Sequence, residues 1–109
     1  MKSEGLEVTI STEGEELCAA LHGEIDHHAA APVRERIDTA LFKYRPRRLT
    51  LDLGAVDFMD SSGLGLILGR AALCEEMGVT LHLLHPGARV KRIFAVAGID
   101  RLRHITIEE

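Results

Sequence analysis

Segments with the hydrophobic period of a strand, about two residues, alternate along this chain with segments that have the period of a helix, about 3.6 residues. Alternation of apolar and polar positions, or a short apolar run, favours strands, and five segments are predicted as strands: residues 6–10, 17–22, 49–53, 79–84 and 104–107. The first two are separated by a polar segment, residues 11–16 with Gly14 at its centre, which predicts a hairpin turn. We expect Gly23 to end the second strand, LTLDL (49–53) to lie centrally and LEVTI (6–10) to lie at an edge.

Three segments between these strands have apolar residues at helical spacing. The first is expected to begin at Asp26 as N-cap and to end at Pro46, with Pro32 in its first turn. The second is expected to begin near Ser61 and Ser62 and to end at Gly78. The third is marked by Val90, Ile93, Phe94 and Ala97, with Gly98 just beyond it. The order β-β-α-β-α-β-α-β predicts the α/β class: a mixed sheet with an opening β-hairpin, right-handed crossovers and at least three helices.

The second predicted helix has an unusual distribution of small residues. At 100° per residue, two apolar stripes emerge: Leu64, Ile67, Leu68, Ala71 and Cys74 on one side, and Leu66, Leu73 and Met77 roughly opposite. The face between them carries Ser62, Gly65, Gly69, Ala72 and Glu76. Glycine inside a helix costs about 1 kcal/mol relative to alanine. Close packing on the sheet is one explanation. We favour the other, a flat face on which another protein docks.

The segment before this helix, Asp60-Ser61-Ser62-Gly63, holds the most informative polar residues. It lies where a strand passes into a helix, at the sheet edge where α/β proteins place their sites. One serine is explained simply as the helix cap. The other hydroxyl is then exposed on a rigid element, where phosphorylation would add negative charge beside Asp57 and Asp60. The residues alone do not decide which serine has which role.

Length and charge narrow the classes of protein. A chain of 109 residues is expected to form one domain, residues 1–109. A net charge of −4, 4% aromatic residues and no Trp argue against nucleic-acid binding. No apolar run approaches the roughly 20 residues of a membrane span, and the start MKSEGLEVTI lacks the apolar region of a signal peptide. With two cysteines outside any CxxC pair, we expect a cytoplasmic protein with reduced thiols.

Several other chemistries fit poorly. Gly63, Gly65 and Gly69 give GxGxxxG, whereas a dinucleotide loop has GxGxxG with an acidic residue about 20 positions on. A triad of Ser61, His27 and Asp26 would need its carboxylate from the neighbouring residue. Arg34 and Asp38 are spaced as an exposed i,i+4 pair. Cys18, Cys74 and His82 are expected to be structural, and no metal or cofactor site is indicated.

Two stretches resemble a known family. FMDSSGLGLILGR (58–70) and GEIDHH (23–28) are similar to the anti-sigma factor antagonists, the STAS domain family, and most of all to the sporulation-type antagonists of the anti-sigma-F factor. The similarity extends over nearly the whole chain. It implies a mixed sheet packed with helices and a partner-switching activity without catalysis. The unmodified antagonist binds an anti-sigma factor that is also a serine kinase, and so frees the sigma factor.

The resemblance also implies site residues and partners. Ser61 is the implied phosphorylation site, modified by the kinase with ATP and restored by a metal-dependent serine phosphatase. The implied docking surface comprises Gly23, Asp26, Asp60, Ser62, Gly63 and Leu64. The free protein is expected to be a monomer without nucleic-acid or membrane partners. Two alternatives stay open: a small nucleotide-binding enzyme that uses Ser61 and the Gly63–Gly69 segment, and a non-phosphorylated scaffold subunit of a stress-signalling complex.

Overall fold

A single mixed sheet forms the centre of the protein. In the computed structural model, which describes residues 6–109, five strands are ordered β1-β2-β3-β4-β5. They are β1 (Glu7–Glu13), β2 (Glu16–Ile25), β3 (Arg48–Met59), β4 (Thr80–Leu84) and β5 (Ile105–Glu108). β1 and β2 form an antiparallel hairpin, and β2 to β5 pair in parallel. The predicted mixed sheet, its opening hairpin, the central position of β3 and the edge position of β1 are confirmed.

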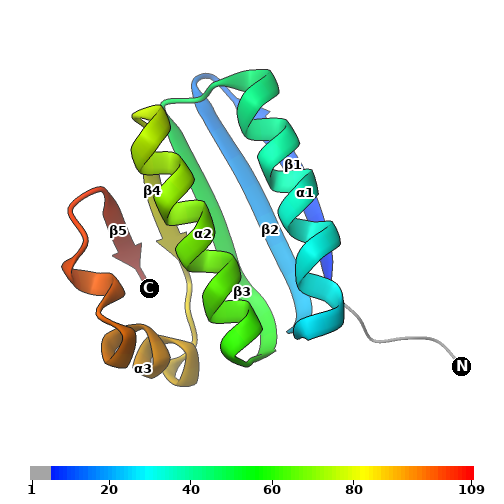
Figure 1. Ribbon diagram of the computed structural model, residues 1–109, viewed down its shortest axis with the longest axis vertical. Coiled ribbons are helices and arrows are strands. Elements are labelled where there is room, and N and C mark those ends of the chain that lie inside the picture. The colour runs from blue at the N-terminus through cyan, green and yellow to red at the C-terminus, as the bar shows by residue number, and fades with distance from the viewer. Residues whose placement is uncertain (1–5) are drawn as a thin grey trace, which may run out of the picture.

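Helices cover one face of this sheet. They are α1 (His27–Tyr44), α2 (Ser61–Met77) and α3 (Ala88–Ala97), and a short 3₁₀ helix, η1 (Ile99–Arg101), follows α3. Figure 1 shows α1 and α2 side by side across the strands, with α3 on the β4–β5 side. Both α2 and α3 end at glycines with positive φ, Gly78 at 74° and Gly98 at 78°. The helix ends predicted at these two glycines are confirmed.

The core lies between the helices and the sheet. Alternate residues of the central strand, Leu49, Leu51 and Leu53, are fully buried there, as period-2 alternation requires. The residues between them point to the opposite face of the sheet, where polar groups bind one another. On β4, His82 pairs with Thr50 of β3 and lies 2.6 Å from the Thr106 hydroxyl and 2.9 Å from the Glu108 carboxylate, so its predicted structural role is confirmed.

The hairpin is longer than its sequence pattern predicts. Both strands extend into the polar segment, and only Gly14 and Glu15 remain between them. Gly23 does not end β2 as predicted: its φ of 107° lets the strand pass through a register shift and continue to Ile25. This extension carries β2 as far as the end of β3.

None of the helices within residues 6–109 has the length and hydropathy needed to cross a membrane.

Candidate functional site

Two strand-to-helix junctions lie side by side at the carboxyl ends of β2 and β3. β2 ends at Ile25 and β3 ends at Met59, and these two residues are paired in the parallel register. The Asp60 N–H donates to the Ile25 carbonyl over 3.4 Å, which ties the junctions together. The predicted site residues Asp26 and Asp60 are therefore brought together, although they are far apart in the sequence.

Each junction is closed by an aspartate. The Asp26 carboxylate accepts hydrogen bonds from the backbone N–H groups of His28 and Ala29, both over 3.0 Å. The Asp60 carboxylate accepts from the N–H groups of Ser62 at 2.8 Å and Gly63 at 3.3 Å. These bonds satisfy donors that a helix start leaves unpaired. The cap of α2 is thus Asp60, and the expectation that a serine caps this helix was wrong.

Because Asp60 caps the helix, neither serine hydroxyl is needed for that purpose. Ser61 is exposed as the first residue of α2, and Ser62 is half-buried. Leu64, one turn further on, is also half-buried. The first turn of α2 therefore presents a hydroxyl to solvent on a rigid helix start, beside an apolar side chain that is partly accessible.

Gly63 has a structural reason to be glycine. A Cβ at this position would lie 2.4 Å from Met59 Cγ and 2.9 Å from Ile25 Cγ2. Gly63 is buried, so it offers a partner little surface of its own, and its expected docking role stays a prediction. Its role is to let α2 approach the ends of β2 and β3. Gly23, also expected at the docking surface, is half-buried in β2 upstream of Asp26.

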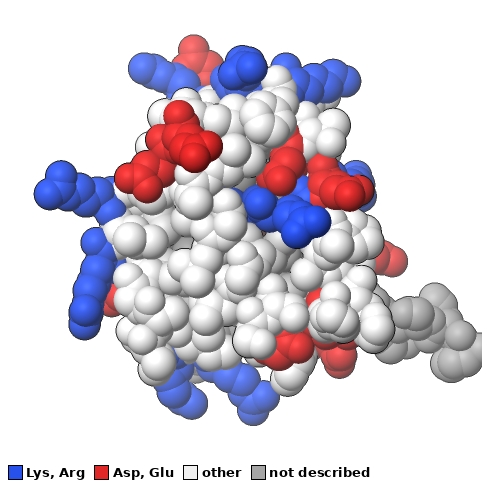
Figure 2. Space-filling model, in the orientation of Figure 1, with Lys and Arg blue, Asp and Glu red and all other residues white. Residues whose placement is uncertain are grey.

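The two other glycines of α2 differ from Gly63. A Cβ at Gly65 or Gly69 would meet nothing within 4 Å, so packing inside the domain does not require glycine there. Gly65 is exposed and Gly69 is half-buried. Figure 2 shows a broad uncharged area over the middle of this face, with charged side chains in its upper part and around its rim. Small residues are therefore accessible on α2 beside the serines.

The helical-wheel prediction for α2 was partly wrong. Ile67, Ala71 and Cys74 are buried as predicted, but Leu68 of the same stripe is 38% exposed. Leu66, from the opposite stripe, is buried. The buried arc of α2 is shifted toward α1, because α2 packs against that helix as well as against the sheet.

A buried ion pair between α1 and α2 was missed. Arg70 Nε lies 2.9 Å from Asp38 Oδ1, and the Arg70 side chain is only 7% exposed. Burial lowers the pKa of Arg70 from its ordinary value, and Asp38 opposes that shift. The expected exposed pair of Asp38 with Arg34 was wrong, since Asp38 turns toward Arg70. The spacing of residues within one helix cannot reveal a contact between two helices.

The alternative chemistries find no arrangement to support them. Gly65 and Gly69 lie inside α2 and so form no phosphate-binding loop. The Asp26 carboxylate binds backbone N–H groups at the start of α1. It would have to give up these bonds to serve in the triad. Within residues 6–109, no group of three or more His, Cys, Asp or Glu residues is placed to hold a metal ion.

The two thiols sit in different surroundings. Cys74 is fully buried on the inner face of α2, and this burial raises its pKa to about 11. Cys18 is half-buried on β2, and partial burial raises its pKa as well, with Asp52 adding to the shift. Both thiols are held in the neutral form, which is typical of structural cysteines.

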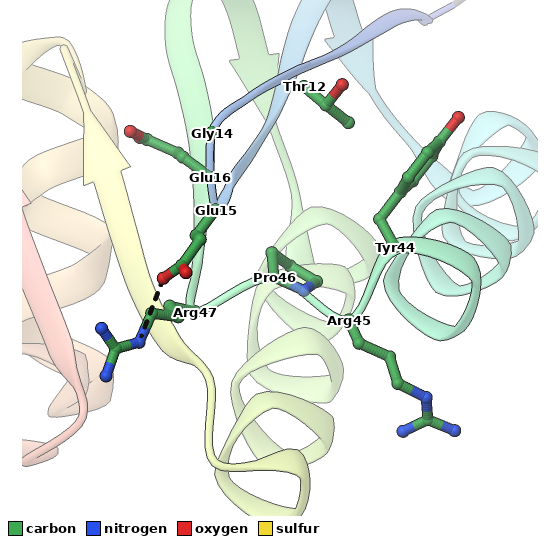
Figure 3. Close-up of a pocket in the computed structure, with 8 residues that line it drawn as sticks. All are labelled: Thr12, Gly14, Glu15, Glu16, Tyr44, Arg45, Pro46 and Arg47. Carbon is green, nitrogen blue, oxygen red and sulfur yellow. Dashed lines mark ion pairs between the residues drawn. The ribbon is translucent and has the colours of Figure 1, made fainter.

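A separate hollow lies at the other end of these strands, where β2 and β3 begin. It has a volume of about 310 Å³ and is lined by the β1–β2 turn and the segment that joins α1 to β3. Figure 3 shows the Glu15–Arg47 ion pair at its rim, while the Tyr44 and Arg45 side chains point away from that pair. Both members of the pair are largely exposed. The hollow is remote from the serines. Glu16, one of its lining residues, has its pKa lowered by hydrogen bonds from the Thr50 and Arg48 side chains.

Comparison with known proteins gives a consistent result. The STAS domain family matches residues 7–108. An anti-sigma F factor antagonist of Lysinibacillus sphaericus is 37% identical over 79 residues, 72% of this chain and 68% of that protein. An anti-sigma-B factor antagonist of Staphylococcus aureus is 30% identical over 83 residues, 76% of each chain.

Solved structures agree with these relatives. The anti-sigma factor antagonist SpoIIAA in its unphosphorylated form superposes with a TM-score of 0.78 and 29% identity, covering 93% of this chain and 87% of that one. Its phosphorylated form superposes with a TM-score of 0.74 over 93% and 90% of the two chains, again at 29% identity. With the family match over nearly its whole length, this chain belongs to the STAS domain family.

Proposed function

We propose that this protein is an anti-sigma factor antagonist whose binding is switched off by phosphorylation of Ser61. The observation that carries the proposal is the exposed Ser61 hydroxyl, which Asp60 frees from capping, beside accessible small residues of α2. The names of its relatives support the same role. In its unmodified form the protein binds an anti-sigma factor and so releases the sigma factor.

The switch requires a kinase and a phosphatase as partners. The anti-sigma factor transfers the γ-phosphoryl group of ATP to the Ser61 oxygen, ADP leaves, and the hydroxyl proton passes to a base on the kinase. A serine phosphatase hydrolyses the ester and restores the hydroxyl. The protein is a substrate in both reactions and not an enzyme, and we place it in the cytoplasm as a monomer when it is free.

The physical basis of the switch is charge in a docking surface. Phosphoserine carries nearly −2 charge at neutral pH. At Ser61 it would lie near the exposed Asp57 and the capping carboxylate of Asp60. A partner that covers this area must remove water from the phosphate and place its own surface against three negative groups. Loss of a few kcal/mol is sufficient, because about 1.4 kcal/mol changes affinity tenfold.

Calorimetry with the anti-sigma factor from the same genome tests the proposal. We expect Ser61→Asp to weaken binding about a hundredfold, or ~2.7 kcal/mol. Ser61→Ala is expected to bind like the unmodified protein and to resist switching. Equal affinities of Ser61→Asp and the unmodified protein would rule out the switch.

Mass spectrometry separates the two serines and the remaining alternative. After incubation with the kinase and ATP, phosphopeptide mapping should place the new group on Ser61, and Ser62→Ala should still be modified. Modification that persists in Ser61→Ala and disappears in Ser62→Ala would transfer the role to Ser62. If no phosphoryl group is gained, the scaffold alternative is favoured.

A further inference from the structure

A groove separates α1 from α2 beside the serines. It has a volume of about 450 Å³, and its lining comes from both helices. The walls are mostly small and apolar, formed by residues such as Ala30, Ala31, Gly65 and Gly69. Ser62 lines the groove at one end, so the groove is continuous with the surface proposed to bind the anti-sigma factor.

Two guanidinium groups give this groove its charge. Arg34 of α1 and Arg70 of α2 both line it, and Asp38 is the carboxylate paired with Arg70. Counting these three side chains, the groove carries one excess positive charge. Figure 2 shows basic side chains over the seam between α1 and α2, with acidic ones close by.

Arg70 has unused hydrogen-bonding capacity. Its Nε lies 2.9 Å from Asp38 Oδ1, but the two groups are not aligned as a hydrogen bond, and Nη1 is buried with no partner among residues 6–109. A buried donor without an acceptor costs about 1–3 kcal/mol. An arginine can bind a carboxylate through two parallel N–H donors. An incoming acceptor would therefore relieve part of this cost.

We propose that this groove takes one carboxylate side chain of the anti-sigma factor, held between the guanidinium groups of Arg34 and Arg70. The inference rests on the proposed function and adds to it the chemistry of the partner. A single carboxylate matches the one excess positive charge, whereas a dianionic phosphate would meet the Asp38 carboxylate. The small walls leave room for the main chain that carries the acidic side chain.

The first test compares two substitutions that remove the same charge from α1. Arg34 is exposed and can be changed without disturbing the core. We expect Arg34→Gln to weaken binding of the full chain to the anti-sigma factor about tenfold, with a smaller dependence of affinity on salt. Lys43→Gln, in the last turn of α1 and outside the groove, should change affinity by less than about twofold. Equal losses for the two variants would overturn the groove assignment.

The second test identifies the carboxylate on the partner. Each exposed acidic residue of the anti-sigma factor is changed to its amide, and each variant is measured against the unmodified chain and Arg34→Gln. One of them should weaken binding to the unmodified chain and have little further effect on Arg34→Gln, the coupling expected of a contacting pair. Additive losses at every position would overturn the proposal.

Two further outcomes separate this proposal from the function on which it rests. If Ser61→Asp abolishes binding while Arg34→Gln binds normally, the switch stands and the groove proposal fails. If the unmodified chain does not bind the anti-sigma factor, both fail. Inorganic phosphate should not saturate the arginine side-chain NMR signals of the free chain at millimolar concentration. Saturation, with normal partner binding by Arg34→Gln, would assign the groove to a small anion instead.

Discussion

Two of the helices that cover the sheet, α1 and α2, begin alike and are built differently. Each follows a parallel strand, and each is capped by an aspartate that accepts two backbone N–H groups. Three residues after the cap, α1 has Ala29 and α2 has Gly63. Only at Gly63 does the end of the strands leave no space for a Cβ. The start of α2 is therefore held against β2 and β3 more closely than an alanine would permit.

Their buried faces differ in the same sense. The underside of α1 is aliphatic: Val33, Ile37, Ala40 and Leu41. That of α2 includes a glycine, an arginine and a cysteine besides its aliphatic residues: Gly63, Leu66, Ile67, Arg70, Ala71 and Cys74. α1 is a helix specified by hydrophobic packing. α2 gives up part of that packing for close approach and polar groups, as expected of an element that also carries a site.

The largest effect on stability should come from filling the gap at Gly63. Gly63→Ala places a methyl group against Met59 and Ile25, both buried. Overpacking of this kind costs about 1–3 kcal/mol, offset in part by the better helix propensity of alanine. We expect a lower free energy of unfolding in urea denaturation.

Gly65→Ala is the matched control on the same helix. Its methyl group meets nothing within 4 Å, so alanine should raise the free energy of unfolding by up to about 1 kcal/mol. In α1, Ala29→Gly should lower it by a similar amount. If Gly63→Ala stabilises the protein as Gly65→Ala does, the closer approach of α2 to the sheet is contradicted.

A smaller effect is expected at the two caps, and here the helices should behave alike. Asp26→Ala and Asp60→Ala each remove two hydrogen bonds to backbone N–H groups. Each should lower the free energy of unfolding by about 1 kcal/mol, and the asparagine variants much less. Thermal unfolding of the four variants provides the measurement. A loss at only one junction would show that the caps are not equivalent.

The last effect is absent at neutral pH: it is a pH dependence that belongs to α2 alone. Burial raises the pKa of Cys74 to about 11 in the folded protein, above the ordinary value of roughly 8.5 in an unfolded chain. The unfolded chain therefore releases this proton first. The stabilisation is fully present below about pH 8.5 and is lost as the pH rises toward the folded pKa.

Melting temperatures at increasing pH test this difference. The unmodified protein should lose more stability between neutral and alkaline pH than Cys74→Ala does, since both share every other titrating group. Parallel losses in the two proteins would contradict the buried thiol as the cause. α1 has no ionisable group on its buried face, so none of its residues can replace this effect.

Much of the fold follows from local patterns because the strands and helix ends are specified locally. Leu49, Leu51 and Leu53 alternate with polar residues, and Gly78 and Gly98 end helices by a conformation that glycine adopts readily. The continuation of β2 through Gly23 could not be predicted in this way. Whether a glycine ends a strand or kinks it depends on the neighbouring strand, here β3, with which it pairs.

The site was predicted in position more fully than in detail. The DSSG segment indicates the strand-to-helix junction. Aspartate and serine are equally good caps, so the sequence does not show that Asp60 is the cap. Arg70 was missed because a charged side chain is rarely buried. Its partner Asp38 lies on another helix, and that proximity is a property of the tertiary fold.

The missing side chain of Gly63 has a mechanical consequence. Met59 and Ile25 block movement of the first helical turn toward the sheet, and the Asp60 carboxylate grips the same turn through its N–H groups. A group attached to Ser61 would therefore sit on a rigid helix start. It would change the surface that a partner contacts and leave the fold beneath unchanged.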